Sequence, residues 1–306
     1  MKISVALCTY NGEEYLANQL DSILHQTVSV NEIVICDDLS FDTTVDIIKE
    51  YKERFPKLFK VFINEKNVGY VKNFEKAITV CSGDLIFLSD QDDLWKPDKV
   101  ETVLKIAKKN VTKNVFSHNL EILNDDGNVI KTSFWKSPGF RTTFSNFQIL
   151  EYLLFERNVF PGMTLVLKKE AKNKYFPLKK LNSTLIHDYE LILRACNNNE
   201  FLLIPEVLTQ YRLHANQNIG FGNLEKTEIN KKEIYLKLKR ITFVEDAVKQ
   251  LNLKPDLIKE YKNQCIRYYK NYIRSLKFPL NIITHIKMKY YYKVLNFDAI
   301  NKTKTV

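Results

Sequence analysis

Acidic residues cluster at one point of the chain, directly after an apolar run. Asp90, Asp92 and Asp93 follow residues 85–88, Leu-Ile-Phe-Leu. Such a run indicates a buried strand, and ligands of open α/β sheets bind where such strands end. Three carboxylates this close repel one another, and a hard divalent cation such as Mg²⁺ or Mn²⁺ relieves the repulsion. The predicted chemistry is metal-assisted handling of phosphate. The alternative is a solvated acidic turn or helix cap, with residues 96–98 opening a helix.

Alternating strands and helices are expected to position this cluster. Apolar runs predict strands at residues 3–9, 32–36, 59–63 and 85–88. Apolar residues at helical spacing predict helices at residues 14–24, 43–55 and 72–80. Strands that alternate with helices of this length form right-handed βαβ units. The sequence therefore predicts an α/β fold with a mainly parallel sheet flanked by helices.

Polar residues follow each of the four predicted strands. They are Thr9-Tyr10-Asn11, Asp37-Asp38, Asn67-Val68-Gly69 and the acidic cluster. Because these ends meet at one edge of a parallel sheet, they are expected to form a single crevice for a nucleotide. The chain has neither G-x-G-x-x-G nor G-x-x-x-x-G-K-[ST], so a dinucleotide fold and a P-loop are disfavoured. Without a glycine-rich cradle, a metal on the carboxylates is the natural means of neutralising a pyrophosphate.

Four ordered motifs carry a resemblance to a known family. They are residues 5–12 (VALCTYNG), 35–40 (ICDDLS), 67–69 (NVG) and 87–95 (FLSDQDDLW). Residues 1–220 resemble the family 2 glycosyltransferases, which have the GT-A fold. The Asp-Gln-Asp-Asp-x-Trp form is similar to the rhamnosyltransferase-like branch of bacterial surface-polysaccharide pathways. The resemblance implies an inverting, metal-dependent enzyme that moves a sugar, such as rhamnose, glucose or galactose, from a UDP- or dTDP-linked nucleotide-diphospho-sugar to a hydroxyl of a glycan or lipid-linked acceptor.

The resemblance also implies which residues bind the nucleotide. Base and ribose are assigned to Thr9, Tyr10 and Asn11, the pyrimidine N–H to Asp38, the base or a phosphate to Lys72, ribose or sugar hydroxyls to Asp90, and the pyrophosphate to Arg212. For Lys72 an ordinary exposed lysine is the alternative.

The resemblance assigns the metal and catalytic roles as well. Asp92 and His214 are expected to hold Mn²⁺ or Mg²⁺, although the choice among Asp90, Asp92 and Asp93 stays open. Asp188 is the expected catalytic base, at a predicted helix start where an acid alone would indicate a helix cap. Acceptor contacts are expected from Gly162, His187 and Trp95.

The last part of the chain differs in charge from the rest. Of the 306 residues, 221–306 hold 19 Lys and Arg against 8 Asp and Glu, whereas the remainder holds 27 against 28. Residues 221–306 are expected to be a basic, aromatic-rich helical extension of a catalytic domain at 1–220. Peripheral contact with an anionic membrane, packing on the catalytic domain and homo-oligomerisation are the alternatives. No nucleic-acid motif is present, so no nucleic-acid partner is expected.

The expected location is the cytoplasm or the inner face of the plasma membrane. The chain has no uninterrupted run of 18 apolar residues, and its five separated cysteines are typical of reduced thiols. Two rival functions stay open. One is a sugar-nucleotide nucleotidyltransferase, which normally carries an N-terminal glycine-rich phosphate loop. The other is a catalytically silent binding or scaffold protein with the same fold.

Overall fold

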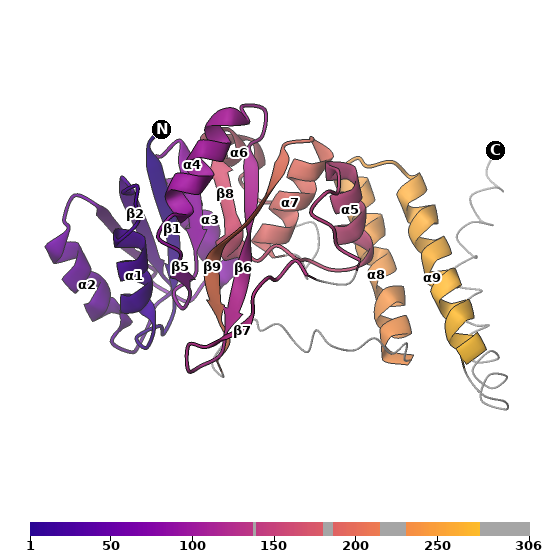
Figure 1. The fold of residues 1–306 in the computed structure, drawn as a ribbon, viewed down its shortest axis with the longest axis horizontal. Helices are drawn as coiled ribbons and strands as arrows, with labels where there is room; N and C mark the ends of the chain where they lie inside the picture. The colour runs from indigo at the N-terminus through magenta and orange to yellow at the C-terminus, as the bar shows by residue number, and fades with distance from the viewer. Residues whose placement is uncertain (137–138, 180–185, 215–230, 276–306) are drawn as a thin grey trace. The chain divides into compact units, whose positions relative to one another are not determined.

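A computed structural model describes residues 1–136, 139–179, 186–214 and 231–275 (Figure 1). The chain divides into two compact units, Met1–Gly220 and Phe221–Val306. The five cysteines are buried free thiols. No helix among the described residues is both long and apolar enough to cross a membrane.

Four parallel strands form the first half of the sheet in the first unit. They are β1 (Ile3–Thr9), β2 (Glu32–Asp37), β3 (Phe59–Ile63) and β4 (Leu85–Ser89). Their spatial order is β3-β2-β1-β4, and each neighbouring pair runs parallel. The connecting helices are α1 (Leu16–Leu24), α2 (Thr44–Arg54) and α3 (Tyr70–Val80). The predicted βαβ order is confirmed, so the carboxyl ends of four strands share one edge.

The sheet becomes mixed beyond β4. Its remaining strands are β5 (Leu94–Trp95), β6 (Val115–Leu123), β7 (Val129–Lys131), β8 (Leu165–Lys168) and β9 (Phe201–Arg212). The order continues β4-β8-β6-β9-β5, with β7 paired to β6 as a hairpin. β8 runs antiparallel to both β4 and β6, whereas β6 and β9 are parallel. The two-residue strand β5 directly follows the acidic cluster in the chain, and β5 pairs with β9. This pairing brings the end of β9 beside the acidic cluster.

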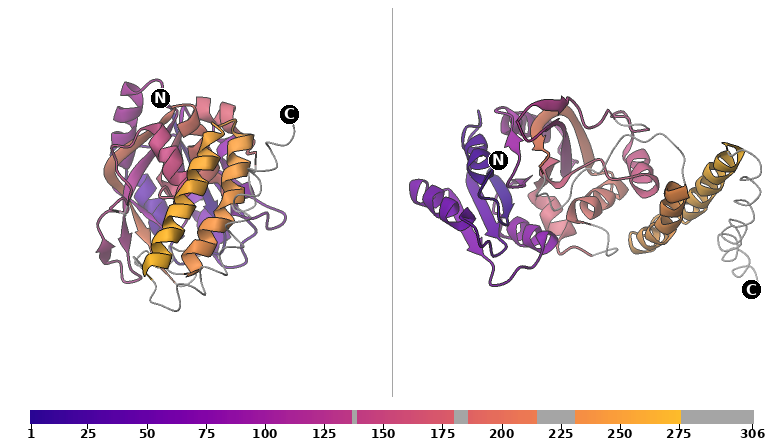
Figure 2. Two further views of the ribbon diagram at one scale, coloured as in Figure 1. Left: turned by 90° about the vertical axis from the view of Figure 1, so that its right-hand side faces the viewer. Right: turned by 90° about the horizontal axis from the view of Figure 1, so that it is seen from below.

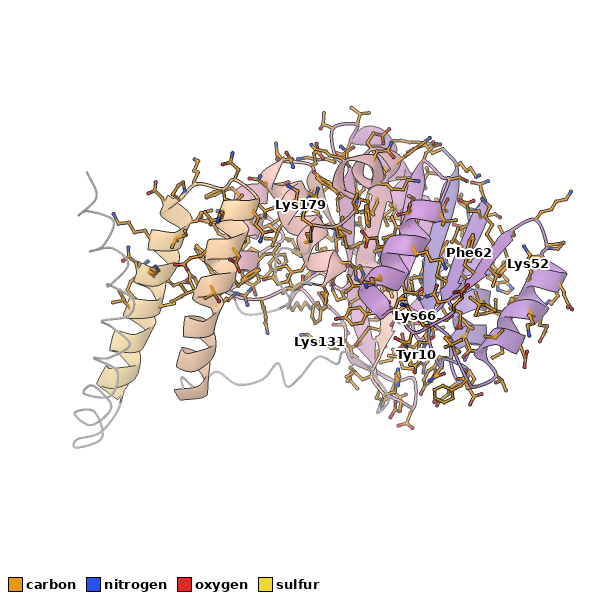
Figure 3. The ribbon with its side chains drawn as sticks, turned by 180° about the vertical axis from the view of Figure 1, so that it is seen from behind. Tyr10, Lys52, Phe62, Lys66, Lys131 and Lys179 are labelled. Carbon is orange, nitrogen blue, oxygen red and sulfur yellow. The ribbon has the colours of Figure 1, made fainter. Side chains whose placement is uncertain are left out.

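Helices cover both faces of the sheet. Alternate residues of β1 and β4, such as Val5 and Phe87, join α1, α2 and α4 (Lys99–Lys109) in one hydrophobic core. Helix α3 packs on β1 and β2 from the opposite face, which Figure 3 shows from behind. Because both faces are covered, the strands are apolar almost throughout, as is typical of buried parallel strands.

The acceptor side of the predicted site is built from the later helices. They are α5 (Asn146–Phe155), the 3₁₀ turn η1 (Gly162–Thr164), α6 (Lys169–Tyr175) and α7 (His187–Asn197). Helix α7 contacts both α3 and α5, so it links the two halves of the sheet.

The second unit contains two long helices among its described residues. Helices α8 (Lys231–Gln250) and α9 (Asp256–Ser275) pack side by side (Figures 1 and 2). Val244, Ala247, Tyr261 and Cys265 are buried between them. Their positions agree with the helices expected in this part of the chain. The basic-aromatic segment after residue 275 lies outside the described residues.

Candidate active site

The end of β1 is tied to the end of β2 through side chains. The Thr9 hydroxyl donates to Asp37 Oδ2 at 2.7 Å, and Ser40 donates to the same carboxylate through its backbone N–H and its hydroxyl. Asn11, at φ 48°, accepts the Phe41 N–H at 3.0 Å. These bonds fix two of the four strand ends against each other, as the single-crevice prediction requires.

Asp38 braces the loop that follows β3. Its Oδ1 accepts from Val68 N–H at 2.8 Å and from the Asn64 side chain at 2.9 Å, and its Oδ2 accepts from Gly69 N–H at 2.8 Å. The side chain is 3% exposed. Asp38 therefore joins the second and third strand ends. The predicted contact with a pyrimidine N–H stays a prediction, because it requires lone pairs beyond those the loop already uses.

Gln91 links the acidic loop to the first strand end. Its side-chain amide accepts from Tyr10 N–H at 2.8 Å and donates to the Tyr10 carbonyl at 3.0 Å (Tyr10 is labelled in Figure 3). A Cβ on Gly12 would lie 2.3 Å from the Gln91 side chain, so only glycine leaves room for this amide. Gln91 therefore has a structural role, because its amide holds the acidic loop against the end of β1.

Ionisation of the buried carboxyl groups in the acidic loop is disfavoured. Desolvation, and then Asp92 and Asp188, raise the pKa of Asp90 to about 8. Asp93 is 1% exposed, and desolvation followed by Asp92 and Asp90 raises its pKa well above the usual range. The buried Lys99 side chain acts against this rise of the Asp90 and Asp93 pKa values, although desolvation lowers the pKa of Lys99 itself well below its usual range. It lies 3.9 Å from the centre of the Trp95 ring and donates to Thr209 and the Met163 carbonyl.

The end of β9 faces the same loop. His214 Nε2 lies 3.0 Å from Asp92 Oδ2, and this contact is the largest cause of a raised His214 pKa. The His214 ring packs on Tyr15 at 4.8 Å, and the Arg212 guanidinium lies 4.9 Å from the same ring. The structure thus brings together the predicted metal ligands Asp92 and His214, which are 122 residues apart in the chain. The predicted pyrophosphate partner, Arg212, lies beside them.

A divalent cation fits this arrangement. Among the described residues no group of three or more His, Cys, Asp or Glu side chains forms a metal site on its own. Asp92 and His214 offer one carboxylate and one imidazole, and Mn²⁺ or Mg²⁺ bound in this way keeps positions open for phosphate oxygens. The crowded carboxyl groups, two of them with raised pKa values, are the chemical argument for a cation, and metal binding stays a prediction.

Asp188, in the first turn of α7, is buried and held by several donors. It accepts hydrogen bonds from the Asn158 side chain and from the backbone N–H groups of Tyr189 and Gly162. Desolvation outweighs these bonds and raises its pKa to about 7. Its charge acts on Asp90 and on the Tyr70 hydroxyl, so both lie within electrostatic range. A carboxylate with this pKa is suited to accept a proton near neutral pH.

His187 fills the space between α3 and the η1 turn. Its ring stacks on Phe74 with centroids 4.5 Å apart, and Nε2 would be 3.0 Å from a Cβ on Gly162. Neither ring nitrogen has a hydrogen-bond partner within the described ranges. Desolvation lowers the pKa of His187 to about 3, so the imidazole is neutral. His187 and Gly162 therefore pack directly beside the predicted base, and their acceptor contacts stay predictions.

Two predicted residues occupy other surroundings. Trp95 is 4% exposed and packs on Phe87 in the core, so its placement gives it a packing role in place of the predicted acceptor contact. An interior position was not foreseen, because nothing in the sequence showed that β5 pairs with β9. Lys72 is exposed in the first turn of α3, and its nucleotide contact stays a prediction.

Three predicted site residues on different elements converge. The charges of both Asp38 and Asp90 raise the pKa of the buried Cys8 thiol, and Asp90 also senses Asp188. Asp38 and Asp90 thus lie within electrostatic range of the same thiol, and Asp188 lies within electrostatic range of Asp90. Sequence reasoning missed Lys99 and Asn158. Lys99 follows the acidic loop by six residues, and its position at the start of a predicted helix was the one available signal.

Fold and site together define a nucleotide-sugar-dependent type of transferase, and comparison with known proteins gives the family. The glycosyl transferase family 2 model matches residues 4–176. The chain is 30% identical to the dTDP-rhamnosyl transferase RfbG of Shigella flexneri over 224 residues, which cover 70% of this chain and 73% of that protein. The chain belongs to glycosyl transferase family 2 and is a glycosyltransferase.

Solved structures support the same fold. S. aureus TarS 1-349 in complex with UDP superposes with a TM-score of 0.58 at 18% identity, covering 91% of this chain and 76% of that one. Mannosyltransferase PcManGT from Pyrobaculum calidifontis, in complex with GDP-Man and Mn²⁺, gives a TM-score of 0.52 at 14% identity, covering 97% of this chain and 82% of that one. The predicted GT-A fold is confirmed.

Proposed function

We propose that this glycosyltransferase moves a sugar, with inversion, from a dTDP- or UDP-linked donor to a hydroxyl of a glycan or lipid-linked acceptor in bacterial surface-polysaccharide synthesis. The observation that carries the proposal is the grouping of Asp38, Asp90, Asp92 and His214 around one edge of the sheet, with Asp188 within electrostatic range. The name of the RfbG relative favours a dTDP-rhamnose donor.

The residues divide the work between binding and proton transfer. Thr9, Tyr10 and Asn11 bind base and ribose, and Arg212 pairs with the pyrophosphate. Asp188 takes the proton of the acceptor hydroxyl as its oxygen attacks the anomeric carbon from the face opposite the leaving diphosphate.

Asp92 and His214 would hold a divalent cation. When bound, such a cation neutralises charge on the departing nucleoside diphosphate. Support comes from the charge of the acidic loop and from the Mn²⁺ and GDP-Man in the PcManGT complex.

A donor panel tests the proposal. The full chain is incubated with dTDP-rhamnose, UDP-glucose, UDP-galactose or UDP-GlcNAc, each with a bacterial glycolipid extract as the source of acceptor hydroxyls, with and without Mn²⁺, and the released nucleoside diphosphate is measured. We expect diphosphate release from one donor, dependent on Mn²⁺, and loss of Mn²⁺-supported nucleotide binding in Asp92→Ala by calorimetry. Release of pyrophosphate from dTTP or UTP incubated with a sugar 1-phosphate would instead identify a nucleotidyltransferase, and no product in either incubation a silent binding protein.

A further inference from the structure

The carboxylate of Asp188 rests against a segment that carries no predicted site residue. Residues 156–161 connect α5 to the η1 turn. From this segment the Asn158 side chain hydrogen-bonds Asp188, and the backbone N–H of Gly162, directly after it, does so as well. Asn158 contacts the predicted base from an element separate from the α7 helix that carries the base.

The orientation of the Asn158 amide follows from its second contact. Its Oδ1 accepts the Phe160 N–H at 2.9 Å. An amide offers one acceptor oxygen and one donor nitrogen, so use of the oxygen by Phe160 leaves the NH₂ group for Asp188. A donor is the polarity that an ionised carboxylate requires. The side chain is therefore fixed at one end and donates at the other.

The segment itself is anchored in the interior. Val159 is 1% exposed and its carbonyl accepts the Trp135 indole N–H at 3.0 Å. Phe160 is fully buried, with its ring centroid 5.2 Å from Phe201 and 5.6 Å from Phe140. Edge-to-face contacts of this kind hold rings in defined positions. A rigid aromatic cluster thus sets the place of Asn158.

We propose that Asn158 is a positioning residue that orients the Asp188 carboxylate for proton transfer from the acceptor hydroxyl. The inference rests on the proposed function. Its physical basis is that a base misplaced by about 1 Å loses on the order of 10²-fold in rate. The amide also stabilises the ionised carboxylate, because it donates a hydrogen bond to that form.

Other groups act on Asp188 from the neighbouring elements. The Asp90 carboxylate after β4 and the Tyr70 hydroxyl at the start of α3 lie within electrostatic range, and the adjacent His187 is neutral. None of these supplies positive charge. The hydrogen bond from Asn158 lowers the pKa of Asp188 and so opposes the desolvation that raises it. Its loss is expected to move the acid limb of the kcat profile to higher pH.

Two substitutions separate positioning from packing. Asn158→Asp keeps the size of the side chain and an acceptor for Phe160 N–H, but it removes the donor. Asn158→Ala removes both. Asn198→Ala is the matched control, because Asn198 lies at the opposite end of α7 and its amide likewise makes two hydrogen bonds, to the Arg194 carbonyl and the Tyr175 hydroxyl.

The measurements are kcat, donor KM, the pH profile of kcat and the calorimetric Kd for UDP or dTDP, whichever belongs to the donor found in the panel, all on the full chain. We expect both Asn158 variants to lower kcat by about 10- to 10²-fold, with KM and Kd within about twofold of wild type, and Asn198→Ala to keep wild-type kcat. A wild-type kcat in Asn158→Asp overturns the inference, as does an equal fall of kcat in the control. If the wild-type chain transfers no sugar while UDP binds, the proposed function fails instead.

Discussion

At the scale of single residues, the properties of the site depend on how each buried carboxyl group is desolvated and hydrogen-bonded. Asp188 is buried, and desolvation outweighs the hydrogen bonds it accepts and raises its pKa to about 7. Asp38 is equally buried, but two backbone N–H groups and one amide hold its carboxylate. Asp188 likewise accepts from two neighbouring backbone N–H groups and one side-chain amide, so the two carboxylates differ in the elements they join: Asp38 ties together two strand-end loops, and Asp188 lies where α7 meets the η1 turn.

Replacing Asp188 tests the proton-transfer role. Asp188→Asn is expected to lower kcat by about 10²–10⁴-fold, the usual size of a general-base contribution. The Kd for UDP should stay near that of wild type, because the substitution keeps size and removes no predicted nucleotide contact. Since the ionised form is the base, wild-type kcat should rise with pH through about 7 and level off above it. The variant should lack that limb; unchanged turnover would exclude Asp188 as the base.

Residue types at strand ends were predictable from sequence, whereas their pairing was not. The acids of the β4 loop and the His187-Asp188 pair were identified because their motifs are local. Asn158 and Lys99 act through partners that folding supplies: Asn158 meets a carboxylate 30 residues later, and Lys99 meets Thr209 across 110 residues. No periodicity or motif encodes such contacts. The interior position of Trp95 was missed for the same reason.

At the scale of elements, the η1 turn and α7 meet with no spare volume. A Cβ on Gly162 would lie 3.0 Å from His187 Nε2 and 4.0 Å from the Asp188 Cβ. Phe74 stacks on the His187 ring, which limits its retreat. The glycine is therefore required by close packing between a turn and a helix.

Gly162→Ala tests this packing. Its methyl group should displace His187 and with it the first turn of α7, so we expect kcat to fall by about tenfold or more. Overpacking of this kind typically costs about 1–3 kcal/mol of folding stability, so the thermal midpoint should fall as well. Steady-state kinetics and calorimetric melting check both effects. A wild-type kcat together with a wild-type thermal midpoint would show that the η1 turn moves to accommodate the methyl group.

Elements with a strong apolar pattern were predicted closely. The strand at residues 59–63 has the predicted bounds, because an apolar run between turn residues defines both of its ends. β9, which lies beyond the four predicted strands, extends from Phe201 to Arg212. Polar residues such as Gln210 interrupt its apolar pattern, and cross-strand pairing with β6 sustains the strand there. The position of β8 between β4 and β6, antiparallel to both, is set by tertiary contacts and could not be predicted from its local sequence.

At the scale of the whole molecule, a neutral catalytic unit is joined to a basic one. The surplus of positive charge resides in residues 221–306, which carry 19 Lys and Arg against 8 Asp and Glu. We propose that this unit brings the enzyme to an anionic membrane surface, where a lipid-linked acceptor would reside. Attraction of this origin weakens as salt screens it.

Vesicle sedimentation tests the membrane proposal. The full chain should bind vesicles that contain phosphatidylserine or phosphatidylglycerol, less at 0.5 M than at 0.1 M salt, and should not bind phosphatidylcholine vesicles. The triple variant Lys287→Glu, Lys289→Glu, Lys293→Glu should lose binding. Lys57→Glu, Lys108→Glu, Lys109→Glu makes the same charge change at exposed positions of the first unit and should keep it. Equal loss in both would point to net charge in place of a localised surface.

Helix α3 contacts both halves of the candidate active site. Its entry is fixed at Gly69, whose N–H is bonded to Asp38 at the nucleoside end. One turn further along, Phe74 supports His187 beside the base. A shift of a few tenths of an ångström in this one helix reaches both ends together. A substitution near Asp38 that changes the proposed donor specificity is therefore expected to shift His187 and the proposed base as well. Changes in donor specificity and in acceptor specificity should accordingly be coupled through α3.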